Sequence, residues 1–158
     1  MVLNTLDLPS GLIAELSRHA NVIGIKDSRG KLELVGELLE ICDSGFQVMV
    51  GNGAILYSAL EIGAVGGIMA VAGLAPNESA DIYRAFVAGR SAEAGRLQEL
   101  VAPVHKGVVG GMGVPGVKAA MDLLGYRGGV PRAPLRPFAE SRMDELRGIL
   151  GTAGLLDS

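Results

Sequence analysis

The chain has 158 residues, 49% of them hydrophobic and 20% charged, and this balance predicts one globular domain rather than a disordered segment. Its net charge of −3 argues against a basic face for nucleic acid or an anionic membrane. Aromatic residues make up 4% and tryptophan is absent, which also argues against a stacking platform for single-stranded nucleic acid.

Alternating helical and extended patterns fill the first half of the chain. Each apolar, β-branched run ends in a polar or glycine-rich turn, which leads into a segment with helical spacing. We predict helices over 9–19, 31–42 and 54–62, and strands over 22–26, 46–50 and 66–71. Strands that alternate with helices predict a parallel sheet built from βα units.

Beyond residue 76 the pattern becomes wholly helical. We predict helices over 77–88, 91–106, 115–124 and 138–150, a glycine-rich link over 107–113 and a loop over 126–137. The chain therefore has three strands and many helices. Three parallel strands would leave two unpaired edges in a monomer, which proteins usually avoid.

Cysteine content and the N-terminal composition bear on disulfides, metal binding and the cellular compartment. A single cysteine, Cys42, excludes an intramolecular disulfide and leaves no cysteine quartet for a metal, so we expect neither a metal nor another cofactor. Residues 1–7 have no basic region and no long apolar core of a signal peptide, and no run of 18 apolar residues exists. We therefore expect a cytoplasmic protein that does not bind membranes.

The stretch Asn21–Gly30 contains the most informative residues. A short β-branched strand ends there at Lys26, and a polar turn follows. Apolar walls around an amine at that position would favour its neutral form, which attacks carbonyl groups to make Schiff bases. Spacing alone leaves open the alternative of a lysine that merely extends into solvent at a strand end. We expect the neighbouring Asp27 to orient the turn rather than to take part in chemistry.

The order Gly24-Ile25-Lys26-Asp27-Ser28-x-Gly30 resembles the Schiff-base motif of the dihydrodipicolinate synthase / N-acetylneuraminate lyase family. The resemblance extends from about Asn4 to Leu156. It includes Asn4-Thr5-x-Asp7-Leu8-Pro9, Gly51-Asn52, and residues 63–68, 113–118, 125–126 and 132–135. Lys26-Asp27-Ser28, taken with Gly-Ala-Val-Gly-Gly over 63–67, most resembles the 4-hydroxy-2-oxoglutarate aldolase branch.

This resemblance implies that the chain corresponds to the C-terminal half of a family member. The implied fold class is α/β, a partial TIM (β/α)8 barrel made of strands six to eight with a C-terminal helical extension. Residues 1–76 would be half-barrel βα units with the lysine. Residues 77–158 would be the last barrel helix and the extension, in one continuous structural domain. A half-barrel would account for the two unpaired sheet edges.

Candidate site residues follow from the rule that barrel chemistry lies at the carboxyl ends of the strands. Lys26 would be the nucleophile, and the Ser28 hydroxyl would bond a distal polar group of the substrate. Gly51 would let a ligand approach the backbone, and Asn52 offers a donor and an acceptor. The family position implies that Ile68 acts through its backbone carbonyl near the substrate carboxylate. Simple turn chemistry remains the alternative for Ser28 and for the Gly51-Asn52 turn.

Two family motifs are missing from the sequence. In the family, a tyrosine of the fifth strand relays protons, and a Gly-Thr-Thr-Gly-Glu-like motif binds the substrate carboxylate. Neither is present, since the resemblance places both upstream of Met1. Tyr57, Tyr83 and Tyr126 fall in predicted helices or in the C-terminal loop and match no catalytic position. Gly73 also stands where many members have asparagine.

Other candidate sites are weaker. Residues 111–116 have the spacing G-x-G-x-x-G, but neither the preceding strand nor the downstream acidic strand of a dinucleotide site is predicted. His19 and His105 have no partners at metal or triad spacing, so we expect structural or surface roles for both. Lys118 matches a family lysine, and we expect it to position the C-terminal helices.

The resemblance implies a lyase or aldolase that forms a lysine Schiff base with pyruvate or a related 2-oxo acid. Because the proton relay and the carboxylate clamp are missing, we expect little or no turnover from the isolated chain. We expect its partner to be either another copy of itself or a complementing N-terminal half-barrel. One alternative is a non-catalytic half-barrel module that self-associates through its sheet edges, and another is a piece of an ordinary longer enzyme.

Overall fold

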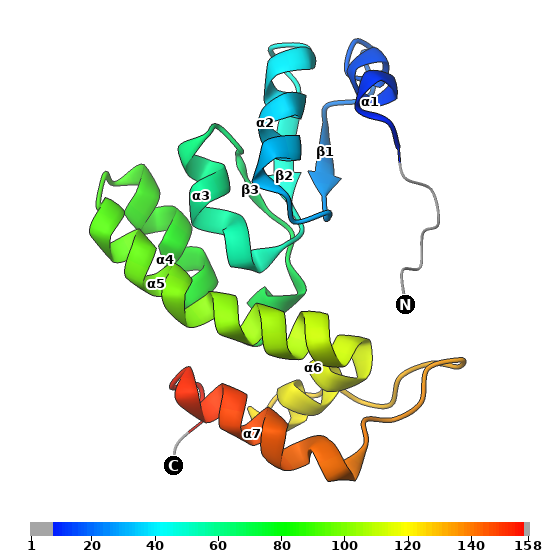
Figure 1. Ribbon diagram of the computed structural model, residues 1–158, viewed down its shortest axis with the longest axis vertical. Coiled ribbons are helices and arrows are strands. Elements are labelled where there is room, and N and C mark those ends of the chain that lie inside the picture. The colour runs from blue at the N-terminus through cyan, green and yellow to red at the C-terminus, as the bar shows by residue number, and fades with distance from the viewer. Residues whose placement is uncertain (1–7, 157–158) are drawn as a thin grey trace.

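Three short parallel strands form a sheet at one end of the protein (Figure 1). The computed structural model describes residues 8–156. The strands are β1 (Gly24–Asp27), β2 (Gln47–Val50) and β3 (Gly66–Gly67), paired in the order β1-β2-β3. Both pairings are parallel, which confirms the predicted strand direction. Asp27 lies opposite Val50 and Val50 opposite Gly67, so the three carboxyl ends are level.

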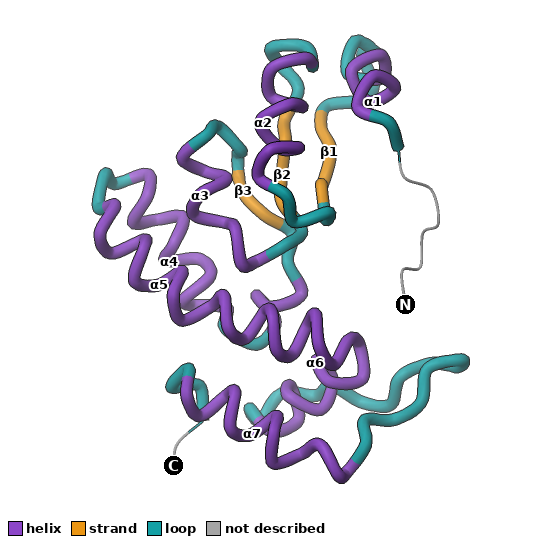
Figure 2. The backbone as a smooth tube through the Cα atoms, viewed as in Figure 1, coloured by secondary structure: helices purple, strands orange, loops and turns teal. Residues whose placement is uncertain are grey.

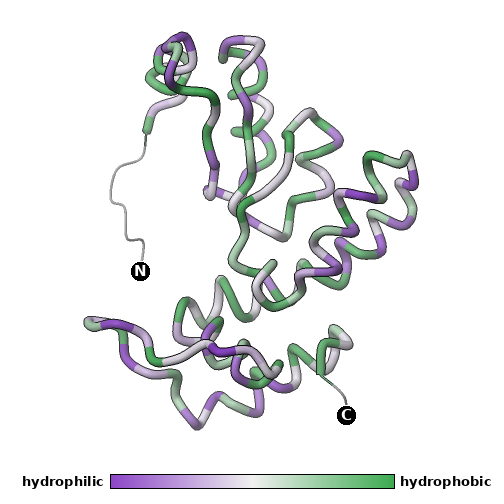
Figure 3. Tube along the Cα trace, turned by 180° about the vertical axis from the view of Figure 1, so that it is seen from behind, coloured by the Kyte–Doolittle hydropathy of each residue, from purple (hydrophilic) through white to green (hydrophobic). Residues whose placement is uncertain are grey.

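Helices cover only one face of this sheet. The helices of this region are α1 (Ser10–Leu16), α2 (Leu32–Ile41), the short 3₁₀ helix η1 (Gly53–Ile55) and α3 (Leu56–Glu61). Val48 and Val50 of β2 point towards the helices and are fully buried, together with Leu38 of α2. Seen from behind in Figure 3, no helix crosses in front of the strands. Of the family-like segment at 4–9, residues 4–7 lie outside the described part.

A second group of helices lies beyond the sheet (Figure 2). Its helices are η2 (Ala70–Gly73), α4 (Pro76–Val87), α5 (Ser91–Val104), η3 (His105–Gly110), α6 (Gly111–Leu123), η4 (Glu140–Arg142) and α7 (Met143–Thr152). The chain turns between α4 and α5 at Gly89, whose φ of 72° lies in the left-handed region that favours glycine. Within residues 8–156, no helix combines the length and the apolar character needed to cross a membrane.

One hydrophobic cluster connects the sheet with both groups of helices. Its fully buried members come from distant parts of the sequence and include Leu38, Val48, Val71, Ile82, Val104 and Leu150. Burial of such side chains contributes about 1.5–3 kcal/mol each, before the entropy cost of ordering them. The strand ends are therefore supported by a core that includes the C-terminal helices.

The third strand is shorter than predicted, so the expected strand over 66–71 is wrong after residue 67. Hydrogen bonds from Val65 N–H to Val48 O and from Ile68 N–H to Val50 O, both 2.9 Å, mark the extent of pairing. Beyond Val50 the β2 segment turns away at Gly51, so the third strand has no partner to follow. The chain then coils as η2 and buries Val71 in the core.

The predicted glycine-rich link over 107–113 is also wrong, because most of it is helical. α5 continues as η3, a π-helix, and then as α6, with a kink at Gly113 (φ 64°, ψ −159°) two residues before Pro115. Val104, Val108 and Met112 recur every four residues and are all buried. Their burial stabilises the helical path against the low helix propensity of the glycines between them.

Candidate functional site

Four of the five predicted site residues lie one or two positions past the level strand ends. Ser28 follows the end of β1 by one residue, Gly51 and Asn52 follow β2, and Ile68 follows β3. The parallel register therefore brings together residues that are up to 40 positions apart in the sequence. The fifth residue, Lys26, occupies the row just before the strand ends, where it pairs with Met49.

The side chain of Lys26 lies on the uncovered face of the sheet. Successive side chains of a strand alternate between faces, and Asp27 is buried whereas Lys26 is exposed. The expectation of a dry, apolar pocket around this amine is therefore wrong for the described chain, because no described helix or strand covers that face. Lys26 also makes no hydrogen bond or ion pair within residues 8–156.

Gly51 provides the space in which Lys26 and Ser28 approach the backbone of the next strand end. A Cβ built on Gly51 would overlap the Ser28 hydroxyl and would lie 2.7 Å from Lys26 Cε. Contacts this short do not occur between real side chains, so any larger residue must displace both neighbours. The side chains of Lys26 and Ser28 therefore both lie over the bare backbone of Gly51. The role of Gly51 towards a ligand stays a prediction.

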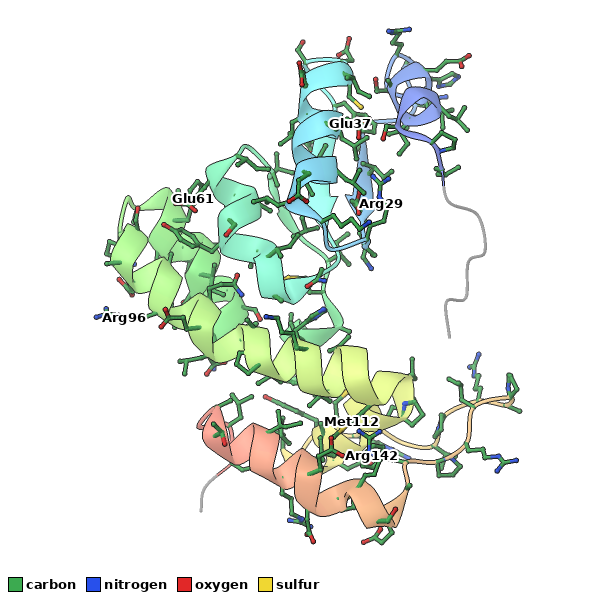
Figure 4. All side chains as sticks on the ribbon, in the orientation of Figure 1. Arg29, Glu37, Glu61, Arg96, Met112 and Arg142 are labelled. Atoms are coloured by element: carbon green, nitrogen blue, oxygen red, sulfur yellow. The ribbon has the colours of Figure 1, made fainter. Side chains whose placement is uncertain are left out.

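The turn after β1 is shaped by an ion pair. The Asp27 carboxylate accepts hydrogen bonds from Arg29 N–H at 2.7 Å and from its guanidinium Nε at 2.9 Å and Nη2 at 2.5 Å. The Asp27 side chain is 2% exposed and that of Arg29 is 27% exposed, so the pair is partly shielded from solvent and stabilises the turn (Figure 4 labels Arg29). The expectation that Asp27 orients this turn is confirmed.

Asn52 links the second strand end to the loop of the first. Its Oδ1 accepts a hydrogen bond from Ala54 N–H at 2.9 Å and thereby caps η1. Its Nδ2 lies against Gly30, where any Cβ would overlap it, and Gly30 has a φ of 71°. The Asn52 amide thus has a role in the turn, and its role towards a ligand stays a prediction.

His105 and Gln98, which the sequence did not single out as site residues, bond the backbone of the turn after β2. Gly53 N–H donates to His105 Nδ1 at 3.2 Å, and Gln98 Nε2 donates to Gly53 O at 2.8 Å. Tyr57 N–H in turn donates to Gln98 Oε1 at 2.8 Å. The pairs are 41 to 52 residues apart, so no local spacing signals them.

His105 has the structural role that the sequence predicts. It is buried at the junction of α5 and η3, and burial lowers the pKa of its imidazole below the ordinary value of 6.5. A neutral imidazole leaves a lone pair on Nδ1, as the hydrogen bond from Gly53 requires.

The third strand contributes Ile68 to the same edge. Its N–H donates to Val50 O at 2.9 Å, and its side chain is 56% exposed. The backbone beyond β3 is therefore held level with Gly51. The role of the Ile68 carbonyl towards a substrate stays a prediction.

The tyrosines lie elsewhere, in α3 (Tyr57), in α4 (Tyr83) and after α6 (Tyr126), so none follows a strand end. A hydrogen bond to Glu61 raises the pKa of Tyr57. The G-x-G-x-x-G segment over 111–116 opens α6 after a π-helix rather than after a strand, so it lacks the setting of a dinucleotide site. Lys118 Nζ donates to Gly128 O at 2.5 Å and ties α6 to the following loop.

Comparison with known proteins identifies the family. The family model described as the dihydrodipicolinate synthetase family matches residues 2–153. This chain belongs to that family. The 4-hydroxy-tetrahydrodipicolinate synthase of Methanoculleus marisnigri is 33% identical over 149 residues, which are 94% of this chain and 51% of the relative. The chain spans about half the length of the curated relatives it matches.

Solved structures of the dihydrodipicolinate synthetase family share the fold. YagE, a prophage protein of E. coli K12 solved in complex with pyruvate, is 25% identical with a TM-score of 0.87, and the match covers 95% of this chain and 52% of YagE. Dihydrodipicolinate synthase from Thermotoga maritima is 26% identical with a TM-score of 0.83, over 93% of this chain and 51% of that enzyme. The predicted family and α/β fold are confirmed. The aldolase branch and the correspondence to strands six to eight stay predictions.

Substitution of Gly51 tests the close approach at the strand ends. We expect Gly51→Ala to displace the exposed, flexible ends of Ser28 and Lys26 and to lower the free energy of unfolding by under about 1 kcal/mol, because both side chains can move into solvent. Gly148 of α7 is the matched control, because a Cβ there meets nothing within 4 Å. Gly148→Ala should raise stability by about 0.5–1 kcal/mol. Urea unfolding measures the free energy of unfolding of both variants. An equal change in the two would contradict the close approach of Ser28 and Lys26 to Gly51.

The buried imidazole predicts a pH dependence of stability. The unfolded chain protonates His105 near its ordinary pKa of 6.5, whereas the folded protein resists protonation until a lower pH. The stability that this group contributes is therefore present above pH 6.5 and falls as the pH drops towards the folded pKa. Urea unfolding of the wild type and of His105→Leu should show a stability difference that narrows below pH 6.5. A difference that is constant with pH would speak against a buried neutral imidazole.

Proposed function

We propose that this chain carries the nucleophilic lysine of a Schiff-base lyase or aldolase that acts on pyruvate or a related 2-oxo acid. The observation that carries the proposal is the place of Lys26 at the carboxyl end of a parallel strand, beside the Ser28 hydroxyl and over Gly51. Membership of the dihydrodipicolinate synthetase family and the fold likeness to YagE, solved with pyruvate, support it.

The chemistry begins with attack of the unprotonated Lys26 amine on the ketone carbon of the 2-oxo acid. The carbinolamine that forms loses water, which leaves a protonated imine between Nζ and that carbon. The imine accepts the electron pair released when a bond to the adjacent carbon breaks, either to a proton or to a second carbon. The resulting enamine is reprotonated or attacks an aldehyde, and water then releases the product and the free amine.

Neighbouring groups supply binding rather than proton transfer in this proposal. Ser28 lies close enough to the Lys26 side chain to bond a polar group of the substrate. The backbone after Gly51 and the carbonyl of Ile68 would border the carboxylate of the bound acid. Among the described residues, no tyrosine follows a strand end, so the proton relay would come from another segment of polypeptide.

The open face of the sheet indicates that this other segment must cover Lys26 and pair with the strand edges. Neither outer edge of the described sheet is paired, and Lys26 is exposed where the reaction requires exclusion of water. We infer that residues 1–76 serve as half-barrel βα units and residues 77–158 as the last barrel helix with its extension. A complementing half-barrel, from another chain or a longer parent, would then complete a (β/α)8 barrel in the cytoplasm.

The aldolase branch of the family remains our proposal for the finer specificity, on the residues Lys26-Asp27-Ser28 and Gly-Ala-Val-Gly-Gly over 63–67. The relatives reported above are named 4-hydroxy-tetrahydrodipicolinate synthase instead. Both activities begin with the same imine at lysine, so the central proposal does not depend on the branch.

A second candidate function is a non-catalytic module that associates with copies of itself. It is favoured by apolar side chains next to the open edges, since Ile23 is 75% exposed before β1 and Ile68 is 56% exposed after β3. Exposed apolar residues beside unpaired strand edges are a template for association.

Trapping with borohydride tests the nucleophile. Incubation of the chain with pyruvate and borohydride should give a stable secondary amine at Lys26, which peptide mapping locates. Lys26→Arg keeps the charge but forms no imine, so it should remain unlabelled. Lys31→Arg removes an exposed lysine five positions away and should label as the wild type does. A wild-type label absent from Lys26 would refute Schiff-base competence.

Measurement of molecular size tests the second candidate function, a module that associates with copies of itself. If the sheet edges pair between copies, sedimentation equilibrium should show a dimer or a larger species. Ile23→Lys places a charge beside the β1 edge and should shift the equilibrium to monomer. Val87→Lys changes an apolar residue of α4 that is 65% exposed and should leave the assembly intact. A wild-type monomer at all concentrations would contradict pairing between copies.

A further inference from the structure

The turn that follows β2 is held by two buried side chains from a helix far along the chain. Gly53 is itself buried, and both its N–H and its carbonyl are bonded, to His105 Nδ1 and to Gln98 Nε2 respectively. A Cβ on Gly53 would overlap Val71 and would lie 3.4 Å from His105 Nδ1. The backbone of this residue is therefore clamped from two sides.

Contacts continue from this clamp to the lysine loop. Gly53 directly follows Asn52, whose Nδ2 lies against Gly30 at the end of the loop that carries Ser28. Gly51, on the other side of Asn52, lies under Ser28 and Lys26 and donates its N–H to Asp27 O at 2.6 Å. The helical junction at α5 and η3 is thus connected to the lysine through consecutive contacts.

We propose that His105 and Gln98 are positioning residues of the site, which fix Gly53 and, through Asn52, the loop that carries Ser28 next to Lys26 of β1. The catalytic part of this inference rests on the proposed function, whereas the positioning part does not. A side chain misplaced by about 1 Å at a reacting centre costs up to about a hundredfold in rate. A clamp on the turn therefore has an effect at the amine that general helix packing does not have.

The geometry at Nδ1 allows a matched set of variants. His105→Leu removes the acceptor and keeps an apolar side chain of similar size. His105→Asn places an oxygen near the position of Nδ1, so it is the conservative variant that should restore the bond from Gly53. Val101→Ala, one helical turn earlier, shortens a side chain that is 1% exposed and leaves both bonds to Gly53 in place.

Two measurements on the 158-residue chain separate the outcomes. Nuclear magnetic resonance follows the exchange of the Gly53 amide and the signals of the Asn52 amide, Ser28 and Lys26. Borohydride trapping with pyruvate follows the rate of imine formation. We expect His105→Leu to expose the Gly53 amide, to move the loop signals and to slow trapping about tenfold. His105→Asn should restore most of the Gly53 amide protection, the loop signals and the trapping rate. Val101→Ala should lower stability but leave these three properties unchanged.

The result that overturns the inference is a His105→Leu variant whose Asn52, Ser28 and Lys26 signals stay at wild-type positions. The same losses in Val101→Ala would also overturn it, because they would then follow from destabilisation alone. If the wild type forms no imine but the loop signals move and recover as expected, the positioning role stands and the proposed function fails. Should His105→Leu not fold, Gln98→Met removes the second half of the clamp and is judged by the same signals.

Discussion

The level pairing of three parallel strands sets where all of the candidate site residues lie. Asp27, Val50 and Gly67 face one another, so the next residue of each strand arrives at the same edge. This register brings the three strand ends together, so that the Lys26 amine, the Ser28 hydroxyl and the bare backbone of Gly51 lie on one small surface. A shift of a single residue would send Lys26 to the helix-covered face, because side chains alternate along a strand.

Because Lys26 is exposed, the proposed chemistry requires a cover that excludes water from the amine. A nucleophilic amine must lose its proton, and an aqueous surface favours the ammonium form. Within residues 8–156, the sheet supplies the position of the amine but not its cover. The open face and the unpaired edges therefore both support the proposal that a further segment of polypeptide completes the site.

Support for the strand ends comes from the C-terminal helices rather than from the sheet alone. The path from α5 through the π-helix η3 brings Gln98 and His105 against the turn after β2. A π-helix widens the helical turn, and such segments are frequent at functional sites. The glycines of η3 allow this path, while the buried Val104, Val108 and Met112 hold it against the core. The C-terminal helices are thus part of the support for the strand ends.

Most of the local elements, the parallel sheet, the family and the residues at the strand ends could be predicted from the sequence. Those properties depend on hydrophobic periodicity and on short motifs, which neighbouring residues define. The sequence placed Lys26 at a strand end and gave Asp27 its role in the turn. It also overestimated the third strand and treated residues 107–113 as a link, because propensity does not record whether a partner strand or a core lies within reach.

The exposure of the amine, the contact of Gly51 with Ser28 and the clamp on Gly53 became visible only in the folded protein. Each depends on groups that are 23 to 52 residues apart, such as Gly51 and Ser28 or Gly53 and His105. Burial and hydrogen bonding between such groups exist only once the chain has packed. For this reason His105 could be assigned a structural role from its sequence neighbours, while the backbone group it holds could not be foreseen.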